Sequence, residues 1–255
     1  MNSLYRVRQG GIGAREAAAC YDPWMPRLAT LLLGTLLLGA CSLSKPGARA
    51  DRLKERPLTG SSVLLVDPDV RLYERTSEGA VEFKVAWTME AEKSVLRALL
   101  DQLNDRRLDL VPYEMPPRGS AREHDDLQVV RLHAAAAQAI HTHYFNPDYR
   151  LPSKQGKFDW TLGPGVKKFK SVRKVDYVLL VCLRDTYSTH GRGFAGILGS
   201  ETKPSAGGQW GLASLVEVGT GNIVWCSRMV RSMGDLREEE PARQAVRALL
   251  EGFPL

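Results

Sequence analysis

The stretch that decides the fold is VDYVLLVCL, residues Val175 to Leu183, because no other run beyond the first 41 residues is as apolar. Its length and its valine content are typical of a β-strand, and almost every position is apolar instead of alternating with polar residues. Strands with this pattern are covered by other elements on both faces of the sheet. We therefore predict a central strand at this place in the chain.

The chain on the C-terminal side of this strand predicts a β-hairpin followed by a helix. QWGLASLVEV and NIVWCSRMV alternate apolar and polar residues, and Gly219-Thr220-Gly221 between them tolerates the positive φ angles of a tight turn. Residues 240 to 251 then form an amphipathic pattern that begins with Pro241 and ends before Gly252. The expected apolar face of this helix consists of Ala242, Ala245, Val246, Leu249 and Leu250.

The chain on the N-terminal side predicts three short strands, a helix, a strand and a second helix. SSVLLVD from Ser61 reads as a buried strand, and VRLYER and VEFKV read as a hairpin. A helix is expected from Thr88, a strand from Leu108 to Tyr113, and a helix from about Asp125 to Phe145, ended by Asn146-Pro147. The expected inward positions are Met89, Leu96, Leu99, Leu100 and Leu103 in the first helix and Val129, Leu132, Ala136, Ile140 and Tyr144 in the second.

The element order βββαβαβββα predicts an α/β fold in which a mixed β-sheet packs with about three helices. The chain has 255 residues, and the roughly 215 that follow the first 40 are enough for one such domain. We expect this single domain to span residues 61 to 255. Its two long irregular segments are the loop-rich stretch after Pro147 and the Gly-rich loop from Ser188 to Gly208.

The N-terminal stretch Leu28 to Cys41, LATLLLGTLLLGAC, indicates export from the cytoplasm. Its eleven uncharged residues from Leu28 to Leu38 are too few to span a bilayer as a helix and have the length of a signal-peptide core. The sequence that follows, Leu38-Gly39-Ala40-Cys41, resembles the lipobox of bacterial lipoproteins. The resemblance implies a signal peptide at residues 1 to 40 and acylation of Cys41 by fatty acids such as palmitate. An uncleaved anchor, a secretory signal with a chance cysteine, and a true start at Met25 remain alternatives.

Charge and composition exclude a nucleic-acid-binding protein. The net charge is +6, and it falls to about +4 without the first 40 residues, which hold four arginines and two acidic residues. This surplus is too small for a nucleic-acid footprint. Much of it lies among Pro and Gly between Lys45 and Arg56, so we interpret residues 41 to 60 as a lipidated cysteine followed by a basic tether. A merely solvated spacer is the alternative.

Motifs for catalysis or for cofactors give no support to an enzyme. The sequence contains no GxSxG, HExxH, Walker A or CxxC pattern. GxGxxG occurs at 191–196, but Pro204 and a Gly pair stand where a phosphate-binding helix should follow. His133, His141 and His143 lack the spacing of a helical zinc site, so we expect them at the surface or its boundary. We predict a protein that is not an enzyme and binds no cofactor, metal or nucleic acid.

Cys182 and Cys226 both fall in predicted strands. We expect them to be core residues that behave as small apolar side chains. In an oxidising compartment they would have the alternative of forming a cross-sheet disulfide.

Several segments of the domain resemble a family of uncharacterised bacterial outer-membrane lipoproteins: VLLVDPDVRLYE, AWTMEAEKSVLRAL, FDWTLGPGV, VDYVLLVCLRDTYST, WGLASLVEVGTGNIVW and GDLREEEPARQAVRALL. More distantly the arrangement is similar to the curli-secretion lipoprotein, the amino-terminal domain of the Tol translocation protein, and lipoprotein activators of peptidoglycan synthases. The resemblance implies a periplasmic domain that binds proteins and assembles. Ser42, in place of an aspartate after Cys41, implies sorting to the outer membrane. VRLYER and VEFKV are too short and charged for the pore-forming hairpin of the curli protein.

Two functional hypotheses follow. In the first, the protein is a non-catalytic, periplasm-facing binding or assembly component of the cell envelope that contacts an envelope partner, or itself, through Phe194, Ile197 and Leu198. In the second, it binds a small ligand, or acts on one, under the loops 158–165 and 188–208, with Arg184, Asp185 and Tyr187. An exposed apolar patch would favour the first hypothesis, and a concave pocket with convergent polar groups would favour the second.

Overall fold

The computed structural model describes residues 45–49, 58, 60–76, 78–106, 108–171, 175–188, 208–232 and 234–254. Several predictions fall outside these residues: the signal peptide at 1–40, lipidation of Cys41, the GxGxxG stretch, and partner binding by Phe194, Ile197 and Leu198.

The described strands form one mixed sheet, which confirms the predicted α/β class. Its nine strands include a path of six in the order β1-β9-β8-β7-β2-β5. These six are β1 (Lys45–Arg49), β9 (Asn222–Arg231), β8 (Gln209–Glu217), β7 (Tyr177–Ser188), β2 (Ser62–Leu65) and β5 (Asp109–Pro112). Strand β3 (Asp69–Arg75) continues along β7 beyond the end of β2, β4 (Val81–Phe83) pairs with β3, and β6 (Trp160–Thr161) pairs with β9.

The predicted central strand is β7, and it runs on to Ser188. Parallel pairing with β2 and β3 on one edge and antiparallel pairing with β8 on the other satisfy its backbone. Its apolar side chains are buried on both faces, as predicted: Leu179, Val181 and Leu183 join one core cluster, whereas Leu180 and Cys182 join the other.

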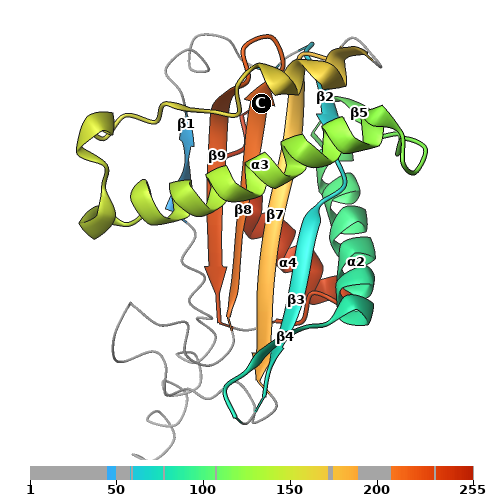
Figure 1. The fold of residues 1–255 in the computed structure, drawn as a ribbon, viewed down its shortest axis with the longest axis vertical. Coiled ribbons are helices and arrows are strands. Elements are labelled where there is room, and N and C mark those ends of the chain that lie inside the picture. Colours follow the sequence, from blue (N-terminus) through green and yellow to red (C-terminus); the bar gives the residue numbers. More distant parts are fainter. Residues whose placement is uncertain are drawn as a thin grey trace, which may run out of the picture. The chain divides into compact units, whose positions relative to one another are not determined.

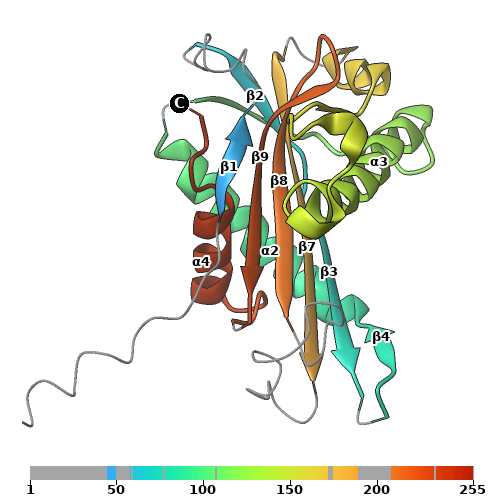
Figure 2. The same cartoon turned by 90° about the vertical axis from the view of Figure 1, so that its left-hand side faces the viewer.

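Helices cover both faces of this sheet. Helices α2 (Val85–Asn104) and α4 (Glu239–Leu249) lie together on one face, and α3 (Ala121–His143) crosses the other (Figures 1 and 2). The 3₁₀ segments η1 (Pro147–Tyr149), η2 (Pro152–Lys154) and η3 (Pro164–Ser171) follow α3. No helix of the described chain is long and apolar enough to cross a membrane.

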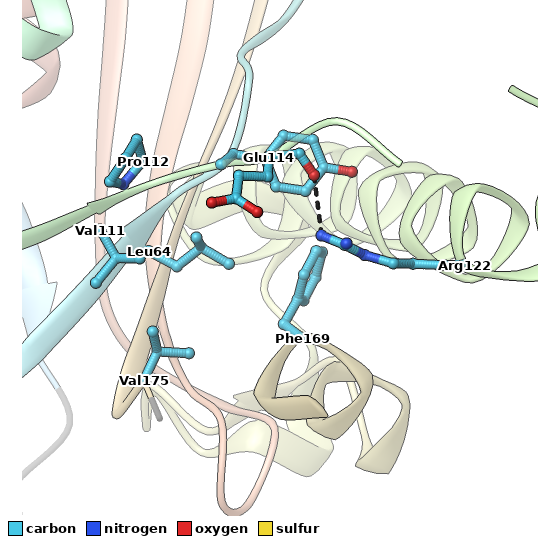
Figure 3. A pocket seen from close by; sticks show the side chains of 8 residues that line it. Leu64, Val111, Pro112, Glu114, Arg122, Phe169 and Val175 are labelled. Carbon is cyan, nitrogen blue, oxygen red and sulfur yellow. Dashed lines mark hydrogen bonds between the residues drawn. The ribbon is translucent and has the colours of Figure 1, made fainter. Parts of the chain in front are cut away.

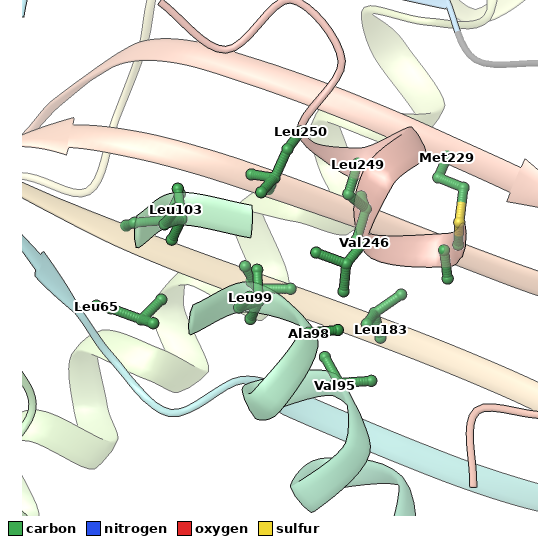
Figure 4. Packing of buried hydrophobic residues seen from close by; sticks show 14 of the residues in the cluster. Leu65, Val95, Ala98, Leu99, Leu103, Leu183, Met229, Val246, Leu249 and Leu250 are labelled. Carbon is green, nitrogen blue, oxygen red and sulfur yellow. The ribbon is translucent and has the colours of Figure 1, made fainter. Parts of the chain in front are cut away.

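The core beneath α2 and α4 consists mainly of aliphatic side chains, with Trp225 and Phe253 among them. Figure 4 shows Leu249 and Val246 of α4 directed toward Leu99 of α2 and Leu183 of the sheet. All four are fully buried, and burying a side chain of this size contributes about 1.5–3 kcal/mol. The predicted apolar face of α4 is confirmed.

The prediction for Met89 at the start of α2 was wrong, because 54% of the residue is exposed. The helix begins at Val85, directly after β4, and this position turns Thr88 inward instead. The Oγ1 of Thr88 accepts a hydrogen bond of 3.0 Å from the backbone N–H of Leu72. A search for apolar periodicity cannot detect a threonine that is buried because it accepts a hydrogen bond from the backbone of a strand.

The inward stripe of α3 also differs from the prediction. Leu132 is 47% exposed, whereas His133, expected near the surface, is buried. The stripe includes two polar residues, since Asp126 accepts a 2.8 Å hydrogen bond from the Tyr113 hydroxyl and His133 Nε2 lies 3.0 Å from Ser214 Oγ. Hydrogen bonds to the sheet compensate for burying these groups, so the inward face of α3 does not follow apolarity alone.

The segment interpreted as a tether is in part an edge strand. β1 pairs antiparallel with β9, Lys45 opposite Arg228 and Arg49 opposite Trp225. Ala48 is buried, and Arg49 Nη2 donates to the Gly252 carbonyl at 2.9 Å. The domain therefore begins well before Ser61. The pattern KPGAR has poor strand propensity, and the pairing depends on the open edge of β9.

Both cysteines of the core are free thiols, and the alternative of a disulfide is not realised. Cys182 on β7 and Cys226 on β9 are separated by β8 and are fully buried. Burial raises the pKa of Cys182 to about 11, and it raises the pKa of Cys226 further. Each behaves as the small apolar residue that was predicted.

The turn between β8 and β9 is fixed by a close contact with the segment after β6. Gly221 has φ +76°, and a Cβ at this position would lie 2.0 Å from the Gly163 carbonyl oxygen. The Leu162 N–H donates to the Gly221 carbonyl at 2.8 Å. The predicted glycine turn is confirmed, and it holds the segment around Trp160 against this end of the sheet.

Candidate functional site

Arg184, Asp185 and Tyr187, which we expected to share a site, do not converge. The alternation of β7 directs Arg184 to the α3 face and directs Asp185 and Tyr187 to the α2 and α4 face. Arg184 forms an ion pair with Asp69 at 2.5 Å and donates to its carbonyl at 2.6 Å. Asp185 accepts from Gln209 Nε2 at 2.7 Å. These partners give the residues structural roles.

Tyr187 belongs to a polar and aromatic cluster that holds the segment before α4 against α2. Its hydroxyl donates to Asp235 Oδ1 at 2.9 Å, and its ring meets Trp87 edge-on at 5.7 Å. The Arg237 guanidinium lies 4.6 Å from the Trp87 ring and 5.2 Å from the Tyr187 ring, and pairs with Asp235 at 2.6 Å. Burial raises the pKa of Tyr187, so its hydroxyl stays protonated at neutral pH.

The two loops of the small-ligand hypothesis are attached at opposite ends of the sheet. Trp160 pairs with Ile223 near the β8–β9 turn. Ser188 and Gly208, which flank the Gly-rich loop, lie where β7 ends and β8 begins, beside the Gln209–Arg231 pair. The described ends of the loops therefore do not border one cavity.

One of the two loops does border a hollow of about 440 Å³. It lies on the α3 side of the sheet, between the end of α3, the two 3₁₀ segments that follow it, and β6. Its lining residues are His143, Tyr144, Phe145, Arg150, Leu151, Lys154, Gly156, Lys157 and Trp160. This volume lies within the range of small-ligand pockets.

Aromatic rings form much of this hollow. The Tyr144 ring meets Phe145 and Phe158 edge-on, at 5.2 Å and 5.0 Å between centroids. The Arg228 guanidinium lies 5.0 Å from the Phe145 ring, and the Lys154 ammonium lies 5.0 Å from the Trp160 ring. These edge-on contacts fix the aromatic side chains before any ligand arrives.

The charged side chains at this hollow are all basic. Arg150, Lys154 and Lys157 line it, and no carboxylate does. Lys154 pairs with Asp159 at 3.2 Å, while Arg150 and Lys157 have no ion-pair partner within the part of the chain that the structure describes. His143 Nδ1 lies 2.7 Å from the Tyr149 carbonyl oxygen. The hollow is therefore a positively charged site.

The turn between the two lysines has an unusual backbone. Gln155 has φ +48°, the one positive φ of a non-glycine residue in the described chain, and Gly156 follows with φ +75°. The Lys157 N–H donates to the Lys154 carbonyl at 2.8 Å and closes the turn. A residue in this conformation stores strain, which is common in ligand-binding segments.

A second, much smaller hollow lies where β2 and β5 meet the start of α3 and η3. Figure 3 shows Leu64 between Val111 and Phe169, with Arg122 on the Phe169 side donating to the Glu114 carbonyl at 2.9 Å. The space inside is about 10 Å³, which admits nothing larger than a water molecule. It is a packing defect on the α3 face.

Exposed apolar side chains gather at one corner of the molecule. The described chain has eight large apolar residues that are exposed, and four of them fall within nine positions of β4 and the start of α2. These four are Val81, Phe83, Val85 and Met89, each at least half exposed. We call them the β4–α2 patch. The Phe83 ring also contacts Tyr73 of β3, at 5.7 Å between centroids.

The buried histidine of α3 is a structural group. Burial lowers the pKa of His133 to about 4, so the ring is neutral at physiological pH and binds Ser214 in that form. His141 is half-buried beside Trp210, and burial together with Arg228 lowers its pKa to about 4. His143 lies at the hollow instead. The structure thus separates the three histidines that the sequence brings close together.

Comparisons with known proteins leave the family of this chain open. No family model matches the chain, and no curated protein matches it. Among solved structures, the chain is similar to the PelC dodecamer from Paraburkholderia phytofirmans, with 12% identity, a TM-score of 0.35, and coverage of 83% of this chain and 94% of that one. A single-residue variant of the same dodecamer gives 12% identity, a TM-score of 0.34, and coverage of 83% and 95%.

Proposed function

We propose that this protein is a periplasm-facing lipoprotein, anchored in the outer membrane through Cys41, that acts as a non-catalytic protein-binding or assembly component of the cell envelope. The observation that carries the protein-binding part is the β4–α2 patch. Four large apolar side chains that are each at least half exposed within nine positions mark a surface that binds something.

The surroundings of the patch also favour an interface. Lys84, between Phe83 and Val85, pairs with Glu74 at 2.6 Å and with Glu82 at 2.9 Å. An apolar centre with charged residues beside it is the usual anatomy of a protein interface. Burying each of the four apolar side chains against a partner would contribute about 1.5–3 kcal/mol.

The partner-binding residues expected from the sequence belong to the same proposal. Ser188, the last described residue before the loop that carries Phe194, Ile197 and Leu198, is opposite Arg75 in the sheet, and Arg75 is opposite Val81. The loop thus leaves the sheet at the level of the patch. We propose that these three residues extend the same partner-binding surface.

The position of β1 supports the anchoring part of the proposal. Cys41 is four positions before Lys45, the first residue of β1. Four residues span at most about 14 Å, so a lipid on Cys41 would hold this edge of the sheet close to the bilayer. Lipoproteins with several acyl chains stay bound to the membrane, whereas one chain alone gives only marginal binding.

Changing the patch tests the protein-binding part. The quadruple variant Val81→Ser, Phe83→Ser, Val85→Ser and Met89→Ser should keep the melting temperature of the wild type within a few degrees. It should lose the photo-crosslink formed in intact envelopes by a crosslinking amino acid at Glu82, in the middle of the patch. Leu127→Ser with Leu132→Ser, two exposed positions of α3, is the control that keeps the crosslink. An unchanged crosslink in the quadruple variant would refute the role of the patch.

Changing the cysteine tests the anchor. Cys41→Ser should accumulate as an unlipidated precursor with its apolar run intact, while the wild type should partition into detergent and carry the added mass of acyl chains. Intact-mass spectrometry of the membrane and soluble fractions distinguishes these products. Recovery of soluble wild-type protein without acyl chains would rule out the lipoprotein assignment.

The hollow beside α3 favours a second candidate function, in which the domain binds a small ligand. The observation behind it is a concave site with fixed aromatic rings and convergent basic groups. We propose binding instead of catalysis, because the hollow offers neither a carboxylate nor a thiol and His143 is held by a backbone carbonyl. Among the described residues, this site includes Trp160 of the 158–165 loop.

A further inference from the structure

We infer that the hollow at the end of α3 binds an acidic saccharide, a sugar that carries a carboxylate or a phosphate group. The inference rests on the second candidate function and specifies its ligand. Its basis is that one site combines aromatic surface with a positively charged rim, formed by Arg150, Lys154 and Lys157. The volume of about 440 Å³ is large enough for one or two sugar rings.

The charge of the rim selects an anion. Two of its three cations, Arg150 and Lys157, have no carboxylate partner among the described residues, although ion pairs satisfy many other basic side chains of this domain. Arg228 adds a further positive charge behind the Phe145 ring. A guanidinium offers a planar pair of N–H donors that matches a carboxylate or a phosphate.

The aromatic side chains select a ligand with rings. A sugar has faces of C–H groups that pack on aromatic rings, and hydroxyl groups at its edges that take part in hydrogen bonds. Tyr144 and Phe145 are held edge-on to each other, and Leu151 adds apolar surface beside them. An inorganic anion would leave this apolar surface unused, and a purely apolar ligand would leave the cations unpaired.

Trp160 provides an independent observation. Its Nε1–H is buried and has no acceptor within the described residues. Buried donors are almost always satisfied, so this one calls for an oxygen acceptor. Trp160 lines the hollow, and the Lys154 ammonium lies over its ring. A hydroxyl or carboxylate oxygen of a ligand would therefore be a suitable acceptor for this N–H.

The backbone turn of the rim fits the same assignment. The turn contains Gln155 with φ +48° and Gly156 with φ +75°. It is closed by the hydrogen bond from the Lys157 amide to the Lys154 carbonyl. Lys154 is further held by Asp159 at 3.2 Å. The backbone of this turn and the Lys154 ammonium are thus placed before binding, which lowers the entropy cost of holding an anion.

The inference is tested by measuring the binding of three oligosaccharides of equal length: one neutral, one with uronic acids and one phosphorylated. The protein used is residues 41–255 with the substitution Cys41→Ser. Calorimetry should detect the uronic acid or the phosphorylated oligosaccharide at least tenfold more tightly than the neutral one, with affinity that falls as salt increases. The two acidic arms distinguish a carboxylate source from a phosphate source.

Variants locate the site. Arg150→Glu with Lys157→Glu should weaken binding of the acidic oligosaccharide at least tenfold, and Trp160→Phe, which keeps the ring and removes the N–H, about three- to tenfold. Arg131→Glu with Lys167→Glu changes the net charge equally at two exposed residues outside the hollow and should have less than a twofold effect. Melting temperatures close to the wild type show that each variant is folded.

Three results would overturn the inference. Equal affinity for the neutral oligosaccharide would refute the acidic class while leaving ligand binding intact. If Arg131→Glu with Lys167→Glu weakened binding of the acidic oligosaccharide as much as Arg150→Glu with Lys157→Glu, the effect would come from net charge alone. No binding of any of the three would refute the saccharide and remove the support for a ligand-binding function, without touching the role of the β4–α2 patch.

Discussion

The two faces of the sheet are built differently. At the centre of the face under α2 and α4 the core is a layer of aliphatic side chains, in which Leu99, Val246 and Leu249 interdigitate above Leu183 (Figure 4). Buried Asp185 and Gln209 lie at one end of this layer and are bonded to each other. Under α3, apolar residues share the interface with the hydrogen-bonded Asp126 and His133. Both hollows described above lie on the α3 face. Both faces contain buried polar groups, but Asp185 and Gln209 lie at the end of the first face, whereas His133 of the second face lies in the middle of α3.

This difference explains where function is free to develop. A close-packed aliphatic layer loses stability with every change in volume. The α3 face ends in short 3₁₀ segments and a two-residue strand, which hold His143, Lys154 and Trp160 at the edge of the core. Substitutions at this edge change the chemistry of the surface without opening the central core.

The largest expected effect is on the aliphatic face. Leu249→Asp should unfold the domain or destabilise it by several kcal/mol, because it buries a carboxylate without a partner among Leu99, Val246 and their neighbours. Arg247→Asp, on the exposed side of the same helix, should cost less than about 1 kcal/mol. Urea unfolding followed by circular dichroism measures both. Similar midpoints for the two variants would mean that α4 does not pack on the sheet in solution.

The next effect separates the polar face from the aliphatic one by its response to pH. His133 has a pKa of about 4 in the folded protein because it is buried, against about 6.5 in an unfolded chain. Below pH 6.5 the unfolded state therefore binds a proton that the folded state does not, and stability falls as the pH decreases from 6.5 toward 4. The loss by pH 4.5 should be roughly 2–3 kcal/mol.

His133→Gln keeps a hydrogen-bonding side chain toward Ser214 without this titration, so it should lose correspondingly less stability between pH 7.5 and pH 4.5. Unfolding free energies of both proteins at the two pH values provide the measurement. His141 and Asp126 titrate in both proteins, and their contributions cancel in the difference. If the stability of the two proteins depended on pH in the same way, the His133 ring would not be shielded from water in the folded protein.

The smallest effect concerns the solvent side of α4. Arg243→Ala removes ion pairs with Glu239 at 2.6 Å and Glu240 at 3.9 Å, all of them largely exposed. Such pairs along one helix contribute about 0.5 kcal/mol or less, and they weaken in salt. A thermal shift of more than a few degrees would show that these charges contribute more to the aliphatic face than their exposure allows.

The sequence was sufficient for the architecture and insufficient for the site. Periodicity predicted the central strand, the β8–β9 hairpin and α4, because most of the buried side chains in these elements are apolar. It missed β1, whose charged and glycine-containing sequence pairs because β9 offers an open edge. It also missed the inward turn of His133, since the hydroxyl that satisfies this ring, Ser214, is far away in the chain.

The hollow was only partly predictable for the same reason. The 158–165 loop, which the sequence singled out, contributes Trp160 to the lining of the hollow. The other walls come from the end of α3 and from two 3₁₀ segments that carry no recognisable motif. Arg184, Asp185 and Tyr187 were singled out as polar residues at the end of an apolar strand. In the structure their charges and hydroxyl are used inside the fold, by Asp69, Gln209 and Asp235.

The edge strand β1 has a consequence for the order in which the domain is completed. Lys45 pairs with Arg228, so nearly the whole domain separates the two strands in the sequence. The first strand to be synthesised therefore remains unpaired until the last one is available, and contacts of such long range form slowly. If the proposed acylation of Cys41 takes place, this delay would keep the cysteine accessible to the acylating enzymes. A chain that begins at Ser61 would fold with the edge of β9 uncovered, and would be prone to pair with other chains.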